Sequence, residues 1–234
     1  MNILITRSLI DSEDLMGKLF SMGHKIVQIP TLKIISAEMK TINANEYNAF
    51  IFTSANAIKN LKLANLNKEK LCFCVGAITE KIARENGFTN TFSAGGTVNA
   101  LKNLIINSDK IDKKSKIAYL CGDNVSQDLD LELKQEGFNI EKIVNYFSKK
   151  ITELNDENKK IIENYPPNII FVYSLRSAES FVEIVKNYSL YTLMTGSTVM
   201  CISKKVANIF VSNGWKKIQI FNPGDELMQL KDIN

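Results

Sequence analysis

Short apolar segments alternate with longer amphipathic segments along almost the whole of this chain, and this alternation limits the folds open to it. Segments such as residues 49–52 and 169–173 are continuously apolar and too short for helices, as buried strands are. Residues 11–22 carry apolar side chains at helical spacing and stop at Gly23. Strands that alternate with helices favour parallel sheets covered by helices on both faces. The sequence therefore predicts an α/β protein.

The predicted elements follow one another in a regular order. Strands are expected at residues 3–6, 25–29, 49–52, 71–75, 91–92, 116–121, 140–146, 169–173, 199–202 and 218–221. Helices are expected at residues 11–22, 55–64, 77–86, 97–106, 126–136, 156–164, 177–187 and 204–212, with a short one after Gly224. Residues 32–45 and 147–154 are more polar and show no helical period.

The two halves of the chain resemble each other. The set Leu15, Leu19, Gly23 and Ile26 recurs at one constant spacing as Leu129, Leu133, Gly137 and Ile140. A repeat of this length indicates duplicated domains, although chance matching of leucine and glycine is the competing explanation. We expect a first, discontinuous α/β domain from residues 1–31 and 151–234 and a second from residues 46–139. Residues 32–45 and 140–150 would connect them.

Composition excludes several classes of function. A single histidine, His24, makes a histidine-rich metal site or a Ser-His-Asp triad very unfavourable to assemble. The four cysteines lie in predicted strands and are expected to be reduced core thiols. The net charge of +4 is mild for a nucleic-acid partner and better suited to an anionic small molecule. The opening apolar residues form neither a signal peptide nor a membrane span, which needs about 20 residues. We expect a cytoplasmic monomer without metal, cofactor, membrane or nucleic-acid partner.

Candidate binding residues lie where predicted parallel strands end and helices begin. Ligands of open parallel sheets bind at this edge, where helix N-termini offer free backbone N–H groups to anions. The residues found there are small, hydroxylated or cationic: Arg7, Thr53, Ser54, Ala55, Asn56, Gly76, Thr79, Gly122, Asp123, Ser174, Arg176, Ser177, Ser203, Lys204 and Lys205. Taken singly, each serine or threonine is more often a helix cap than a ligand contact. No glycine-rich nucleotide loop follows any predicted strand.

Several of these segments resemble the uroporphyrinogen-III synthase family. The first half carries Asn2-Ile-Leu-Ile-Thr-Arg7, Phe52-Thr-Ser-Ala-Asn-Ala57 and Val75-Gly76 with Thr79. The second half carries Leu120-Cys-Gly-Asp123, Gly137-Phe138 and Tyr146. The similarity runs in order over essentially the whole chain. Two positions depart from it: Ser203-Lys-Lys-Val206 replaces a Gly-Pro-Thr-Thr segment, and Ser126-Gln127 stands where an arginine is frequent.

The resemblance implies a fold, a substrate and an activity. It implies two doubly wound parallel-sheet domains, flavodoxin-like and joined by a two-stranded connector, with the substrate held between them. It implies that hydroxymethylbilane, a linear tetrapyrrole with acetate and propionate groups, is cyclised with inversion of its last pyrrole. The binding residues above would hold those carboxylates. Tyr146 matches a recurrent tyrosine of the family and is either the proton donor to the leaving hydroxyl or an anchoring aromatic.

Two other readings fit the same pattern. A two-domain binding protein would capture an anionic ligand without converting it. A sugar-transferring enzyme would use twin α/β domains and a nucleotide-phosphate site. Turnover of hydroxymethylbilane distinguishes the first from an enzyme, and protection by a nucleotide sugar would support the second.

Overall fold

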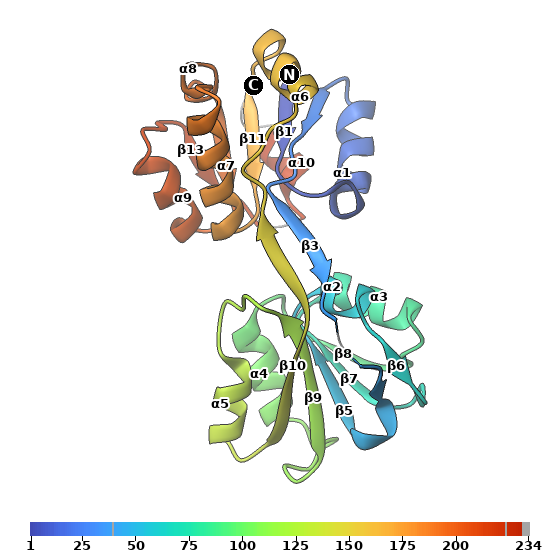
Figure 1. Cartoon of the computed structure of the whole chain (residues 1–234). Helices are drawn as coiled ribbons and strands as arrows, with labels where there is room; N and C mark the ends of the chain where they lie inside the picture. Colours follow the sequence, from blue (N-terminus) through green and yellow to red (C-terminus); the bar gives the residue numbers. More distant parts are fainter. Residues whose placement is uncertain (39, 223, 231–234) are drawn as a thin grey trace. The chain divides into compact units, whose positions relative to one another are not determined.

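The computed structural model describes residues 1–38, 40–222 and 224–230 and divides into two compact units (Figure 1). The first unit comprises Met1–Lys33 and Lys149–Asn234, and the second comprises Ile34–Ser148. The second unit is therefore wider than the predicted domain 46–139. Residues 34–45 and 140–148, expected as connectors, belong to it because two of its sheet strands run through them.

The first unit is built on a five-stranded sheet in the order β13-β12-β11-β1-β2. The strands are β1 (Asn2–Ile5), β2 (Lys25–Gln28), β11 (Ile169–Val172), β12 (Thr198–Cys201) and β13 (Ile218–Ile220). All four neighbouring pairs are parallel. Side chains of β1 enter both cores of this unit, because Leu4 faces one side of the sheet and Ile3 and Ile5 face the other. This two-sided burial explains the continuously apolar strand sequences.

Helices cover both faces of this sheet. One core is shared with α6 (Asp156–Asn164), α7 (Leu175–Asn187), α8 (Tyr191–Met194) and α9 (Lys204–Val211). The opposite core is shared with α1 (Leu9–Ser21) and α10 (Glu226–Gln229). The α1 helix ends before Gly23, whose φ of +80° is a left-handed conformation that glycine adopts without steric cost.

The second unit contains a six-stranded sheet in the order β3-β10-β9-β5-β7-β8. The strands are β3 (Leu32–Ser36), β5 (Ala49–Phe52), β7 (Leu71–Cys74), β8 (Asn90–Ser93), β9 (Lys116–Gly122) and β10 (Asn139–Lys150). The pairs from β10 to β8 are parallel. One face packs against α2 (Ala55–Lys59) and α3 (Ala77–Glu85), and the other against α4 (Val98–Ile106) and α5 (Leu129–Gln135).

The strand orders of the two sheets correspond when the second unit starts from β9. In this alignment β1 and β2 match β9 and β10, while β11, β12 and β13 match β5, β7 and β8. In each sheet, successive strands are first added on one side of the starting strand and later on its other side, so the strand order reverses at one point. That point lies between β1 and β11 in the first unit and between β9 and β5 in the second. Ligands of such sheets bind outside the carboxyl ends of the strands at this point.

Several predicted segments differ from the structure, among them residues 147–150, which continue β10. The helix predicted at 55–64 ends at Lys59, because Leu63–Ala64 (β6) pairs instead with Ile42–Asn43 (β4). The helix predicted at 126–136 begins only at Leu129. Residues 32–45, expected without regular structure, contain β3, β4 and the start of a 3₁₀ helix, Ala44–Glu46. Tertiary pairing decides these segments, and a local sequence pattern does not record it.

The cysteines are free and buried, as predicted. Within the described ranges, no helix has both the length and the apolar character needed to cross a membrane.

Candidate active site

The carboxyl edge of the first sheet is formed by two helix starts with serine caps. Ser174 caps α7 and accepts a hydrogen bond from the Ser177 backbone N–H at 3.0 Å. Ser203 caps α9 in the same way and accepts from the Val206 backbone N–H at 3.4 Å. Both hydroxyls serve as caps here, so a ligand would meet them together with the remaining free N–H groups of each first turn.

Cationic side chains stand in these first turns. Lys204 and Lys205 are exposed at the start of α9, and Arg176 is partly buried at the start of α7. Neither helix has an acidic residue in its first turn. Positive charge at a helix N-terminus opposes the helix dipole and typically costs about 0.3–1 kcal/mol at the surface. These cations therefore slightly destabilise the two helix starts and attract an anion to them.

Arg7 and Tyr173 form a stacked pair at the switch point of this sheet. The Arg7 guanidinium carbon lies 4.0 Å from the centre of the Tyr173 ring. Tyr173 is only 8% exposed, and its hydroxyl lies near the Glu226 carboxylate. Burial, followed by the nearby Glu226 carboxylate, raises the pKa of the Tyr173 phenol. The phenol therefore keeps its proton at neutral pH.

Ser177 does not face this edge. It is 4% exposed, and its hydroxyl hydrogen-bonds the hydroxyls of Thr6 at 3.0 Å and Thr31 at 2.5 Å. This buried hydroxyl cluster ties α7 to the ends of β1 and β2. The Ser177 hydroxyl is thus already engaged in this buried cluster, and its predicted role in ligand binding stays a prediction.

The carboxyl edge of the second sheet contains the start of α2. Ser54 caps α2 and accepts from the Asn56 backbone N–H at 3.1 Å. Thr53, directly before it, has its hydroxyl 3.1 Å from the Tyr119 hydroxyl. Ala55 and Asn56 form the first turn and are partly buried. The second sheet therefore presents hydroxyls and backbone N–H groups at its switch point, without an added cation in the first turn of α2.

Tyr146 lies directly on Gly122 at the same switch point. A Cβ atom built on Gly122 would stand 2.6 Å from Cζ of Tyr146 and 2.9 Å from its hydroxyl oxygen. Burial raises the pKa of the Tyr146 phenol, while a hydrogen bond from Ser54 acts in the opposite direction. The Asp123 backbone N–H donates to the Tyr146 carbonyl at 3.1 Å, and the Asp123 carboxylate accepts from the Ser148 N–H at 2.9 Å. Glycine is required at 122 because the ring occupies the space of a side chain.

The start of α3 forms the next position along this edge. Gly76 caps α3, and a Cβ atom there would lie 3.3 Å from Cα of Gly96. The Gly96 backbone N–H donates to the Val75 carbonyl at 2.8 Å, which holds the two backbones together. Thr79, one turn into α3, is 6% exposed. Gly76 thus offers backbone rather than a side chain, and Thr79 offers little surface.

A family comparison decides the class of protein. The family model for uroporphyrinogen-III synthase HemD matches residues 13–222. The chain belongs to the uroporphyrinogen-III synthase family. The resemblance found in the sequence motifs is thereby confirmed. A comparison with curated proteins gives no match.

Two solved structures from the family share the fold. The uroporphyrinogen-III synthetase of Helicobacter pylori 26695 aligns with a TM-score of 0.68 and 16% identity, over 100% of this chain and 99% of that one. A mutant uroporphyrinogen-III synthase of the extremely thermophilic bacterium Thermus thermophilus aligns with a TM-score of 0.56 and 13% identity, over 99% and 98% of the two chains. Both likenesses support a mixed α/β fold with parallel sheets.

Most of the predicted residues lie at the carboxyl ends of the strands of the two sheets. In the first unit the carboxyl ends of β1, β11 and β12 carry Arg7, Ser174, Arg176, Ser203, Lys204 and Lys205, and in the second unit the carboxyl ends of β5, β7, β9 and β10 carry Thr53, Ser54, Ala55, Asn56, Gly76, Gly122, Asp123 and Tyr146. Sequence reasoning missed Tyr119 and Tyr173, because each was read as a core residue of a strand or its end. No three His, Cys, Asp or Glu side chains among residues 1–38, 40–222 and 224–230 are placed to hold a metal ion.

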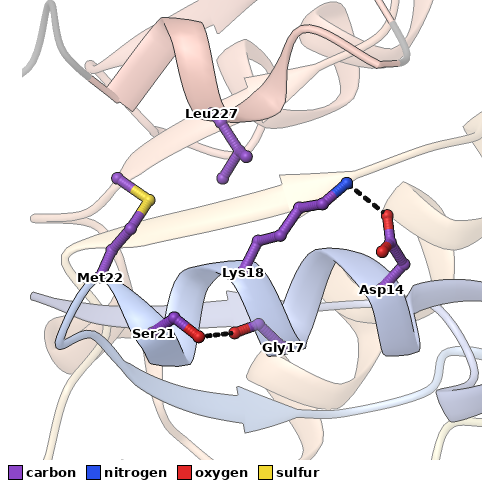
Figure 2. A pocket seen from close by; sticks show the side chains of 6 residues that line it. All are labelled: Asp14, Gly17, Lys18, Ser21, Met22 and Leu227. Carbon is purple, nitrogen blue, oxygen red and sulfur yellow. Dashed lines mark hydrogen bonds and ion pairs between the residues drawn. The ribbon is translucent and has the colours of Figure 1, made fainter.

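A hollow of about 560 Å³ in the first unit is lined by residues of α1, by Met22 directly after it and by Leu227 of α10 (Figure 2). Its polar side chains already have partners: Lys18 pairs with Asp14 at 2.6 Å, and the Ser21 hydroxyl donates to the Gly17 carbonyl at 2.9 Å. Leu227 and Met22 supply its apolar wall. No unpaired charge converges on this hollow from the residues that line it, so it is not the candidate site.

Proposed function

We propose that this chain is a uroporphyrinogen-III synthase, a lyase that cyclises hydroxymethylbilane with inversion of the last pyrrole and loss of water. The family match over residues 13–222 carries the proposal. The anion-compatible helix starts support it, because the substrate bears carboxylates on every pyrrole. We also propose that the two units are flavodoxin-like, doubly wound domains, that β3 and β10 form the connector between them, and that the protein is a cytoplasmic monomer.

Carboxylate binding falls to the helix starts and the cations beside them. In the first unit Arg7, Arg176, Lys204 and Lys205 supply positive charge, and the caps Ser174 and Ser203 stand beside free N–H groups. In the second unit Thr53, Ser54 and the turns after Gly76 and Gly122 supply neutral donors. Charge-assisted hydrogen bonds of this kind are roughly twice as strong as neutral ones.

The main task of the protein in this reaction is to fix the conformation of the bound substrate. Loss of the hydroxymethyl oxygen as water leaves an electrophilic carbon, which the last ring can attack through either of two α-carbons. Attack through the already substituted carbon gives a spiro intermediate that fragments and recloses with that ring inverted. Holding one folded conformer and excluding simple closure selects this route.

Tyr146 is the proposed proton donor to the leaving hydroxyl. Its pKa is raised by burial, so the phenol keeps its proton at neutral pH, as a donor must. It stands beside Ser54 and Gly122, at the switch point of the second sheet. A purely anchoring aromatic would need no hydroxyl, and Phe in its place separates the two roles.

The test is incubation of the purified chain with freshly prepared hydroxymethylbilane, followed by separation of the porphyrin isomers after oxidation. We expect the inverted type III isomer to dominate. Accumulation of only the type I isomer at the uncatalysed rate would reject the enzyme, and binding without conversion would favour a ligand-binding protein.

A further inference from the structure

The side chains of β10 alternate regularly between the two faces of the second sheet as far as Val144. Ile140 packs in the core shared with α4 and α5, and Ile143 packs in the core shared with α2 and α3. Val144 pairs with Cys121, whose side chain also lies on the α4 and α5 side. Continued alternation would place the next even-numbered residue, Tyr146, on that same side, away from Ser54.

A β-bulge at Asn145 reverses this outcome. The register shifts after Val144, so that Tyr146 rather than Asn145 pairs with Gly122. Two residues of β10 thus oppose one residue of β9, which is the defining feature of a bulge. Tyr146 consequently packs in the core shared with α2 and α3 and lies on Gly122. One inserted residue decides on which face of the sheet the phenol stands.

Asn145 is bound at both its side chain and its backbone. Its side chain is fully buried, and Nδ2 donates to the Ala57 carbonyl of α2 at 2.6 Å. Its own carbonyl accepts from the Ala37 N–H at 3.0 Å, beyond the end of β3. The bulged residue therefore joins α2, which Ser54 caps, to the strand that carries Tyr146.

The remaining amide oxygen of Asn145 makes this arrangement costly. Oδ1 is buried and has no hydrogen-bond partner among the described residues. A buried polar group without a partner typically costs about 1–3 kcal/mol. An apolar residue of similar shape would avoid this cost but would leave the Ala57 carbonyl unpaired. Stability alone gives a weak reason for asparagine at this bulge.

We infer that Asn145 is a positioning residue, which holds the bulge and thereby directs the Tyr146 phenol toward Gly122 and Ser54. The inference rests on the proposed function of Tyr146 as donor. It predicts that Asn145 influences the reaction only through that phenol. Its role differs from that of the binding residues, because Asn145 is fully buried and contacts no substrate.

The kinetic test is a double-mutant cycle of Asn145→Leu and Tyr146→Phe. Leucine keeps the approximate shape of asparagine and removes both amide groups. In the Tyr146 background we expect kcat to fall about 10- to 100-fold with KM within twofold, since misplacement by about 1 Å costs rates of this order. In the Tyr146→Phe background the same substitution should change kcat less than twofold. Equal losses in both backgrounds would overturn the inference.

A matched control and a structural readout complete the experiment. Asn60→Leu removes another amide-to-carbonyl bond of α2, from Nδ2 to the Asn56 carbonyl at 2.8 Å, without touching the bulge, and should leave kcat unchanged. Nuclear Overhauser contacts between the Tyr146 ring and the Gly122 α-protons should be present in the unmodified protein and in Asn60→Leu, and lost in Asn145→Leu. Their retention in Asn145→Leu would contradict the inference whether or not the protein converts hydroxymethylbilane.

Asn145→Ser covers the case in which Asn145→Leu does not fold. The serine hydroxyl is too short to replace the bond to Ala57 and introduces no bulky apolar group. We expect it to weaken the same ring contacts and to lower kcat in the Tyr146 background alone. A wild-type protein that forms only the type I isomer would reject the proposed function, whereas additive kinetics in an active enzyme would reject only the positioning role.

Discussion

Gly122→Ala should displace the Tyr146 phenol while leaving the backbone of β9 undisturbed. Gly122 does not adopt a positive φ, so alanine meets no backbone strain there. The added methyl group would stand 2.6–2.9 Å from three atoms of the Tyr146 side chain. Carbon atoms in contact prefer about 3.5–4.0 Å, so the phenol must move by about 1 Å.

A displacement of about 1 Å at a group that transfers a proton typically lowers the rate on the order of 100-fold. We therefore expect kcat of Gly122→Ala to fall about 10- to 100-fold. Overpacking of this kind should also lower the free energy of unfolding by about 1–3 kcal/mol. Initial rates of type III isomer formation and urea denaturation measure the two effects separately.

Gly17→Ala is the matched control for this substitution. Gly17 lies in the exposed interior of α1, and a Cβ atom built there meets nothing within 4 Å. Alanine should stabilise the helix by about 0.5–1 kcal/mol and leave kcat unchanged. Wild-type kcat in Gly122→Ala, or an equal loss of kcat in both variants, would refute the role given to the Gly122–Tyr146 contact.

Three further substitutions test separate parts of the account. Tyr146→Phe should lower kcat more than it raises KM, and full activity would leave the ring as an anchor only. Arg7→Ala combined with Arg176→Ala should raise KM and lower kcat/KM, and unchanged constants would remove both from carboxylate binding. Glu80→Gln should cost about 1 kcal/mol at pH 7, since the Thr91 hydroxyl at 2.7 Å and Arg84 hold the pKa of Glu80 below its usual 4.5. A carboxylate whose pKa is lower in the folded than in the unfolded protein stabilises the fold above its unfolded pKa, and this stabilisation is lost as the pH falls through its folded pKa. The free energies of unfolding of wild type and Glu80→Gln should therefore converge below pH 4.5. A difference that does not change with pH would argue against this role of Glu80.

Much of the fold could be predicted because parallel strands that are buried on both faces have continuously apolar sequences. The strand at Ala49–Phe52 and the helix at Asp156–Asn164 have the predicted bounds. The helix predicted at 55–64 was too long, because β6 pairs with β4 through contacts distant in sequence. Local periodicity cannot report such pairing.

The candidate site was predictable by position but not by orientation. Strand ends and helix caps mark the edge of a parallel sheet, and this rule found Ser54, Ser174 and Ser203 as caps. The rule cannot tell an exposed cap from a buried hydroxyl one turn later, such as that of Ser177. The bulge at Asn145 has no local signature either, because it depends on pairing with β9 and on the Ala57 carbonyl.

The isomer composition of the product formed from fresh hydroxymethylbilane tests the central claim most directly. With the purified chain present at catalytic concentration, the type III porphyrinogen should form faster than spontaneous closure and should account for nearly all the product. A product that remains the type I isomer, formed at the rate seen without protein, would contradict the assignment of this chain as an enzyme that inverts the last pyrrole.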